Sequence, residues 1–156
     1  MSSAPVPSVF TRVFLASDHA GFERKSFILK QLTAAQIDVV DLGPLTYDPA
    51  DDYPRTVRPA ALRVQAEPQT CAIIIGKSGQ GEAMVANRVP HVRAAVYAGG
   101  GLELVDLARA HNDANVLSLG AGFVTNEEGW DAVQRFIATP ASTDERHVRR
   151  RAQIDG

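Results

Sequence analysis

Five short apolar runs, each followed by a longer segment of mixed character, constrain the fold of this chain more than any other feature. The third run, residues 72–75, is continuously apolar and mostly isoleucine, which is typical of a strand covered on both faces. Alternation of this kind predicts a parallel sheet with helices on both faces. We therefore expect an α/β fold with three αβα layers, Rossmann-like, around a five-stranded parallel sheet. The expected strands are residues 13–16, 39–43, 72–75, 94–97 and 115–119.

Helical spacing of apolar residues marks several of the intervening segments. Residues 21–34 and 102–108 each place their apolar side chains on one face of a helix. Thr125, which precedes two glutamates, is a helix start, and Pro140 follows the end of that helix. Residues 142–153 are rich in arginine and predict a basic C-terminal helix.

The composition is that of one globular domain. Of the 156 residues, 45% are hydrophobic and 22% are charged, and a chain of this size can bury a proper core. We expect a single domain over residues 1–156, with residues 1–10 as a loose leader that lacks the order of a signal peptide. The formal net charge of −2 gives no electrostatic reason to expect nucleic acid or membrane as a partner. The lone cysteine, Cys71, excludes an intramolecular disulfide, and these features together favour the cytoplasm.

Ligands of such sheets bind beyond the carboxyl ends of the strands. The most informative of these segments is the glycine loop, residues 76–82, which precedes a short helical stretch. Its glycines allow successive backbone amides to converge on an anion. The loop is not a nucleotide P-loop, because Cys71 stands where that motif requires its first glycine. It is not a dinucleotide fingerprint either, because its order is G-x-x-G-x-G.

Glu82 at the end of the glycine loop has two open interpretations. An acid in a first helical turn stabilises the helix dipole by roughly 0.3–1 kcal/mol and needs no other role. Alternatively, Glu82 is a general base that removes a proton from the carbon next to a carbonyl, and the loop amides hold the developing oxyanion. From spacing alone the two interpretations are equally favoured.

Five motifs in the right order make the chain resemble the ribose-5-phosphate isomerase type B family, which also includes the galactose-6-phosphate isomerase subunits. Ser17-Asp18-His19-Ala20-Gly21 is the first motif, and the resemblance extends to about Arg151. The others are residues 47–54, residues 76–82 with 86–88, residues 111–117 and residues 145–150.

The resemblance implies an aldose–ketose isomerase that needs neither a metal nor an organic cofactor. The implied reaction converts ribose 5-phosphate to ribulose 5-phosphate through ring opening and an enediolate. The resemblance also implies a homodimer, with a tetramer left open, whose active sites take residues from both subunits. Isomerisation of another four- to six-carbon sugar phosphate stays open, as does a non-catalytic sugar-phosphate-binding module.

The resemblance also assigns roles to individual residues. One branch of the family uses a cysteine base at the position of Gly76, and the other uses a glutamate at the position of Glu82, so this chain resembles the glutamate branch. Ser78 matches a hydroxyl that assists proton movement, Asp18 belongs to the catalytic set, and His111 is a candidate acid or base for ring opening. The implied substrate-binding residues are His19, Tyr47, Gly76, Lys77, Gly79, Gly81, Asn112, Arg146, His147 and Arg150.

Without the resemblance, several of these residues have simpler interpretations. Asp18 would be a helix N-cap and His111 a partner of a helix dipole. The arginines of the tail would form a solvated basic face. Three acids of the loop before Tyr53 are interpreted as turn formers; they are Asp48, Asp51 and Asp52.

Two positions depart from the family pattern. Gly122 stands where the family usually has an arginine that helps to hold the phosphate. Loss of one such contact costs about 1.5–3 kcal/mol, or roughly ten- to hundredfold in affinity. Lys77 stands where small residues are common. Three explanations of these departures stay open. Lys77 supplies a positive charge that compensates for the missing arginine, the pocket accepts a different sugar phosphate, or the activity is weak.

Overall fold

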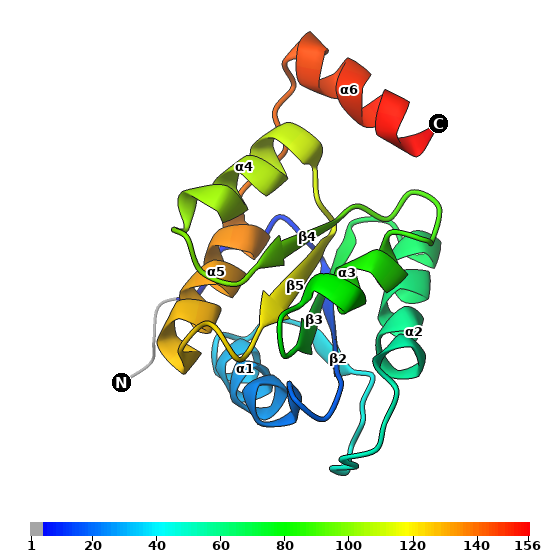
Figure 1. The fold of residues 1–156 in the computed structure, drawn as a ribbon. Coiled ribbons are helices and arrows are strands. Elements are labelled where there is room, and N and C mark those ends of the chain that lie inside the picture. Colours follow the sequence, from blue (N-terminus) through cyan, green and yellow to red (C-terminus); the bar gives the residue numbers. More distant parts are fainter. Residues whose placement is uncertain (1–4) are drawn as a thin grey trace.

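The computed structural model describes residues 5–156 and contains one five-stranded sheet. The strand order is β2-β1-β3-β5-β4, and every neighbouring pair is parallel (Figure 1). The predicted α/β class and five-stranded parallel sheet are therefore confirmed. The strands are β1 (Arg12–Ser17), β2 (Val39–Asp41), β3 (Thr70–Gly76), β4 (Ala94–Tyr97) and β5 (Val116–Gly120).

Helices cover both faces of the sheet and complete the three layers. The first face packs against α1, α4 and α5, and the second packs against α2 and α3. The basic helix α6 is also present as predicted, and it lies beside α4 outside the two helical layers (Figure 1). The helices are α1 (Phe22–Ala34), α2 (Tyr53–Ala66), α3 (Gln80–Ala86), α4 (Glu103–Asn112), α5 (Asn126–Ala138) and α6 (Glu145–Asp155).

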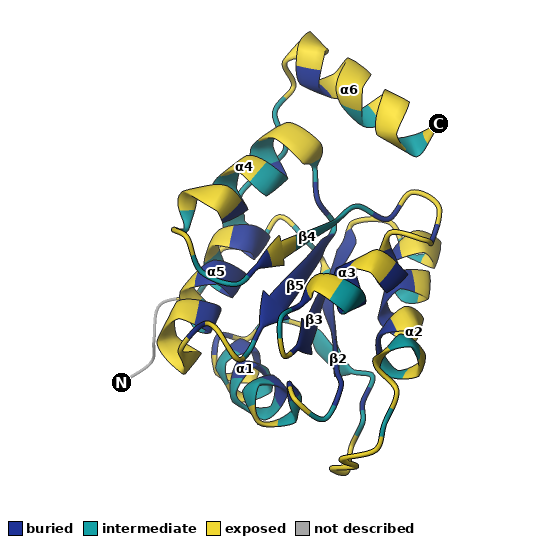
Figure 2. Cartoon of the chain, in the orientation of Figure 1, coloured by how far each residue is buried: buried dark blue, intermediate teal, exposed yellow. Residues whose placement is uncertain are grey.

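The central strand β3 explains why the two cores are separate. All seven of its residues are buried, and successive side chains of a strand point to opposite faces. Ile73 and Ile75 belong to the core under α1, α4 and α5, whereas Ile74 belongs to the core under α2 and α3. Figure 2 shows this buried strand between exposed helix surfaces.

The helix α2 was not predicted from the sequence. Pro54 lies in its first turn, which is a favourable position, but Pro59 lies inside the helix and argues against it. Packing overrides that penalty, because four apolar side chains of α2 are buried against the sheet. They follow helical spacing and are Val57, Ala60, Ala61 and Val64.

The expected loose leader over residues 1–10 is wrong for its second half. The Val9 backbone N–H donates to the Ile137 carbonyl at 2.8 Å, and the Phe10 ring stacks on Phe136 with centroids 5.9 Å apart. Residues 1–4 lie outside the described part of the chain. Val6 and Phe10 pack against the core, and burial of these apolar side chains explains why residues 6–10 are not a loose leader.

The Arg109 side chain links the end of α4 to the end of α5 and to the segment before β5. This side chain is 3% exposed, donates to the carbonyls of Thr139 and Ala114, and pairs with Asp113 at 2.8 Å. Its guanidinium also lies 4.6 Å from the centroid of the Phe10 ring. A buried charge of this kind needs all its partners, because breaking such a set leaves polar groups unpaired. Within residues 5–156, no helix is long and apolar enough to cross a bilayer.

We predict that Arg109→Ala lowers the free energy of unfolding by about 3 kcal/mol, because buried acceptors lose their donor. Urea denaturation measures the change. The control is Arg135→Ala, which removes a half-exposed pair with Asp106 and changes stability by less than about 1 kcal/mol. Equal effects of the two substitutions would contradict the role of Arg109.

Candidate active site

The carboxyl ends of β1, β3 and β5 meet at one edge of the sheet. The pairing register places Ser17 beside Ile75, and Gly76 beside Gly120. The segments that follow these strands are therefore neighbours. They bring together Asp18 after β1 and the glycine loop after β3, as expected from the topology.

Asp18 is held rigidly at this edge. Its side chain is buried, and its Oδ1 accepts a hydrogen bond from the Gly21 N–H at 3.0 Å. Its backbone N–H donates to the Ile75 carbonyl at 3.2 Å. The N-cap of α1 is Gly21 and not Asp18, so the simple capping interpretation of Asp18 is wrong. The hydrogen bond from Gly21 instead fixes the Asp18 carboxylate in the turn that precedes the helix.

Glu82 occupies the space that a side chain at Gly76 would fill. The residue is 4% exposed although it lies in the first turn of α3, so its carboxylate is directed inward rather than to solvent. A Cβ atom built on Gly76 would overlap that carboxylate. The glycine is therefore required for the close approach of the Glu82 carboxylate to the backbone at position 76.

Burial raises the pKa of the Glu82 carboxyl above its usual range, and the neighbouring Asp18 carboxyl adds to the increase. A hydrogen bond from the Glu82 backbone opposes these two effects. Both increases have an ordinary cause, because a low dielectric and a like charge disfavour the ionised form. A carboxylate that only stabilised the helix dipole could face solvent, so the burial of Glu82 needs a further explanation.

The glycine loop presents free backbone donors near Glu82. Gly79 has a φ of 78°, which lets the chain turn into α3. Within residues 5–156 the backbone N–H groups of Ser78 and Gly79 donate to no backbone or side-chain acceptor. The Ser78 hydroxyl is partly exposed and accepts a weak hydrogen bond from the Gln80 N–H at 3.3 Å. These groups can bind an anionic oxygen.

The side chain of Lys77 lies along Gly122, which follows the adjacent strand. A Cβ atom built on Gly122 would lie 3.2 Å from both the Lys77 Cγ and the Lys77 carbonyl oxygen. The Gly122 N–H donates to that carbonyl at 2.9 Å. Lys77 is exposed and forms no ion pair with the described acids, so its ammonium is available beside the glycine loop.

Two aromatic residues border the site, and the sequence pointed to only one of them. Tyr47 is 58% exposed and makes an edge contact with Phe22. Tyr53 was not singled out, yet a Cβ atom at Gly81 would lie 2.8 Å from its ring. The Tyr-Pro helix start was the only signal in the sequence that could have located Tyr53.

His19 follows Asp18, and its ring contacts the loop before α2. Its Nδ1 lies 2.6 Å from the Asp51 Oδ1. The interpretation of Asp51 as a turn former predicts no contact with His19, so this partner is a finding of the structure. No spacing rule would have found it, because the two residues are 32 positions apart.

The remaining predicted residues lie at the opposite edge of the sheet. Helix α4 starts beyond the carboxyl end of β4 and ends at its amino end, so His111 and Asn112 are near the start of β5. The seven residues of β3 separate the two edges by roughly 20 Å. One chain therefore does not bring this group to Glu82. The group consists of His111, Asn112, Arg146, His147 and Arg150.

Within that second group, two histidines stack. The rings of His111 and His147 have centroids 4.1 Å apart and are inclined by 12°. Burial lowers the pKa of His147, and the His111 ring adds to the decrease. Arg146 pairs with Asp144 at 3.2 Å, and Arg150 is exposed, so the helix presents positive charge to solvent.

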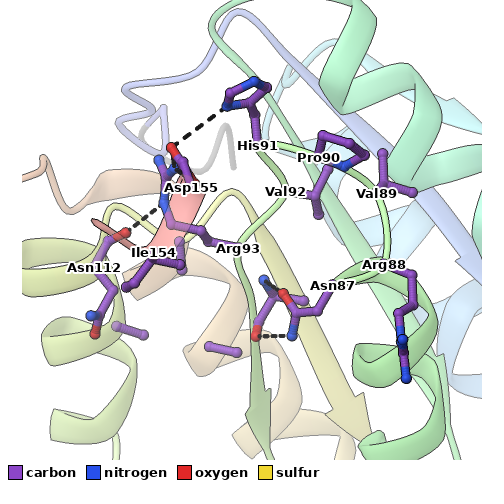
Figure 3. Close-up of a pocket in the computed structure, with 14 residues that line it drawn as sticks. Asn87, Arg88, Val89, Pro90, His91, Val92, Arg93, Asn112, Ile154 and Asp155 are labelled. Carbon is purple, nitrogen blue, oxygen red and sulfur yellow. Dashed lines mark hydrogen bonds and ion pairs between the residues drawn. The ribbon is translucent and has the colours of Figure 1, made fainter. Parts of the chain in front are cut away.

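A cavity of about 570 Å³ opens beside the edge strand β4. Asn112 lines it together with Asp155, which forms a two-point ion pair with Arg93 (Figure 3). Neither Glu82 nor Asp18 lines it. Within residues 5–156, no three His, Cys, Asp or Glu side chains are grouped so that they could hold a metal ion.

Residues 13–154 match the model of the family described as Ribose/Galactose Isomerase, and the chain belongs to that family. Ribose-5-phosphate isomerase B of Mycolicibacterium paratuberculosis is 41% identical over 139 residues, which are 89% of this chain and 86% of that protein.

Solved structures of similar proteins have the same fold as this chain. Ribose-5-phosphate isomerase B from Mycoplasma genitalium, with bound ribulose-5-phosphate, has a TM-score of 0.86 and 37% identity, covering 92% of this chain and 93% of its own. Ribose 5-phosphate isomerase B from Anaplasma phagocytophilum has a TM-score of 0.83 and 33% identity, covering 94% and 98%. The Rossmann-like fold predicted from the sequence is thereby confirmed.

We predict that Gly76→Ala lowers kcat about hundredfold, because the methyl group displaces the Glu82 carboxylate and a shift of about 1 Å has that effect. Steady-state kinetics with ribose 5-phosphate as the substrate measure kcat. In a Glu82→Gln background the same substitution should cause little further loss, since both act on one group. Full activity of Gly76→Ala would show that the carboxylate position is not critical.

Proposed function

We propose that the protein is an aldose–ketose isomerase that interconverts ribose 5-phosphate and ribulose 5-phosphate. The observation that carries the proposal is the buried Glu82 carboxylate in the space beside Gly76, next to free loop amides. The similarity to ribose-5-phosphate isomerases B supports the choice of substrate.

In the proposed reaction, Glu82 removes the proton from C2 of the open-chain aldose. The electron pair moves to the carbonyl, and the oxyanion of the resulting enediolate is stabilised by the N–H groups of Ser78 and Gly79. A proton then returns to C1, and the C2 hydroxyl becomes the ketose carbonyl as it loses its proton. Ser78 is placed to assist the proton movement between the two oxygens.

In this scheme, Asp18 adjusts the pKa of the base, Glu82. Its carboxyl raises the pKa of Glu82 in addition to the effect of burial. A base works best when its pKa lies near the operating pH, so a rise from the ordinary glutamate value improves proton abstraction. The hydrogen bond to Gly21 fixes Asp18 where it can exert this effect.

We further propose that the active protein is a homodimer whose partner subunit supplies the second group of residues. His111 would open the sugar ring, Asn112 would bind sugar oxygens, and the tail of α6 would bind the phosphate through Arg146, His147 and Arg150. The roughly 20 Å between the two edges of the sheet supports this assignment. His111, Asn112 and both arginines are exposed in the single chain and so are available to a partner.

The absence of a side chain at Gly122 makes other sugar phosphates a second candidate substrate class. Lys77 lies against Gly122 and offers the charge that position 122 lacks. The test is to measure kcat/KM for a panel of four-, five- and six-carbon aldose phosphates and to compare the values. Preference for ribose 5-phosphate would support the first choice, and preference for another member would replace it.

We place the protein in the cytoplasm. Sugar phosphates are charged metabolites that membranes retain inside the cell. The single Cys71 is fully buried, and burial raises the pKa of its thiol, which suits an unreactive thiol in a reducing compartment.

We predict that Glu82→Gln lowers the rate of ribulose 5-phosphate formation by about 10²–10⁴-fold, the usual contribution of a general base. In the unsubstituted protein, kcat/KM should fall as the pH drops through the raised pKa of Glu82, because only the carboxylate accepts a proton. A coupled assay with purified protein over a pH series measures both effects.

The same substitution should increase the free energy of unfolding at neutral pH. A folded-state pKa above the unfolded value means that the native state binds the proton more tightly, so ionisation of Glu82 destabilises the fold as the pH rises. Gln removes that ionisation. Activity retained by Glu82→Gln, or absent from the parent protein, would contradict the proposed function.

We predict that two inactive variants restore activity when mixed. A dimer of one Glu82→Gln chain and one His111→Gln chain contains one intact site, so random reassociation of equal amounts yields about a quarter of the parent activity. Each variant alone serves as the control. Failure to recover activity after denaturation and joint refolding would contradict a shared site.

A further inference from the structure

The His19 ring and backbone are both bound by one carboxylate from a distant loop. Asp51 Oδ1 lies 2.6 Å from His19 Nδ1 and accepts the His19 backbone N–H at 3.1 Å. The other ring nitrogen, Nε2, has no hydrogen-bond partner within residues 5–156. The ring is 38% exposed, so one side of the imidazole is fixed and the other is open at the carboxyl edge of the sheet.

Asp51 is unlike the neighbouring acids of its loop. Its side chain is 9% exposed, and its Oδ2 is buried without a hydrogen-bond partner in the described chain. Asp48 and Asp52 are exposed, and Asp48 accepts a local hydrogen bond from the Ala50 N–H, as a turn former does. Burying a carboxylate with an unpaired oxygen is unfavourable, which indicates a role other than turn formation.

Acidic groups surround His19 on both segments that pack against it. The hydrogen bond to Asp51 raises the pKa of His19, burial opposes the rise, and the charges of Asp18, Asp51 and Asp48 add to it. Asp18 belongs to the segment after β1, whereas the other two belong to the loop before α2.

We propose that Asp51 is a positioning residue that fixes the Nδ1 side of His19, so that the protonated ring presents Nε2–H to the phosphate of the substrate. This inference rests on the proposed function and deepens it. The chemistry requires the charged ring, because a neutral imidazole that donates Nδ1–H to Asp51 has an acceptor at Nε2. An acceptor repels a phosphate dianion, whereas an imidazolium donates to it.

The proposal has a defined dependence on pH. Because the pKa of His19 is raised, the imidazolium persists above the ordinary histidine range, and substrate binding weakens as the pH rises through the raised value. Removal of the Asp51 charge moves this weakening to lower pH. The chemical step at Glu82 is not affected directly, so the change should appear in KM rather than in kcat.

The first test is nitrogen-15 NMR of His19 in the full-length protein without substrate. We expect the Nδ1–H tautomer in the neutral form, a lower pKa of His19 in Asp51→Asn, and no comparable change in Asp52→Asn. Asp52 is an exposed neighbour whose side chain makes no capping hydrogen bond, so it controls for loss of one charge. An Nε2–H tautomer in the unsubstituted protein would overturn the proposal even if Asp51→Asn failed to fold.

The second test is kinetic. Asp51→Asn should raise KM for ribose 5-phosphate about tenfold at pH 7.5 and change kcat less than about twofold, with Asp52→Asn unchanged. In a His19→Gln background, Asp51→Asn should have little additional effect, because it acts through His19. Additive effects, or a loss confined to kcat, would overturn the proposal.

The outcomes separate this inference from the proposed function. If the protein does not isomerise ribose 5-phosphate, the NMR test is repeated with inorganic phosphate as the probe. A rise of the His19 pKa with phosphate in the unsubstituted protein, which Asp51→Asn weakens, supports the role of Asp51 independently of catalysis. No response to phosphate in the unsubstituted protein would overturn it.

Discussion

The pairing of β3 with β1 and β5 is the constraint on which the rest of the structure depends. β3 is buried along its whole length and is the only described strand that touches both. Because all three strands are parallel and in register, the segments after them emerge at one edge. Asp18, the glycine loop and Gly122 are neighbours for this reason alone. Apolar burial, which is worth about 25 cal/mol per Å², thus sets the geometry of a polar site.

Buried acidic groups at the site lower the stability of the fold locally. Glu82 is an acid inside the protein beside a second acid, and its ionisation works against folding in the pH range where the proposed reaction requires the carboxylate. Two glycines make the arrangement possible, one by leaving space for the carboxylate and one by a left-handed turn. The contact between Asp51 and His19 has a similar cost, because the Asp51 carboxylate is largely buried and its Oδ2 has no hydrogen-bond partner in the described chain. In the proposed role, this carboxylate stabilises the charge of His19.

Much of the fold could be predicted because it depends on local patterns. The isoleucine run of β3, the helix start at Thr125 and the arginine-rich tail each carry their own signal. Helix α2 could not be assigned with Pro59 in its interior, since only packing against the sheet compensates for it. The contact between Asp51 and His19 joins two loops through tertiary folding, so no local pattern indicated it. The separation of Glu82 from His111 follows from strand length and crossover direction, which require the assembled sheet.

The central claim is that Glu82 moves a proton between C2 and C1 of the sugar phosphate. The most direct measurement is proton NMR of ribulose 5-phosphate formed from ribose 5-phosphate in D₂O. We predict that the protein incorporates solvent deuterium at C1, and that Glu82→Gln does so about 10²–10⁴-fold more slowly. Incorporation at an undiminished rate in Glu82→Gln would show that another group is the base and would contradict the account.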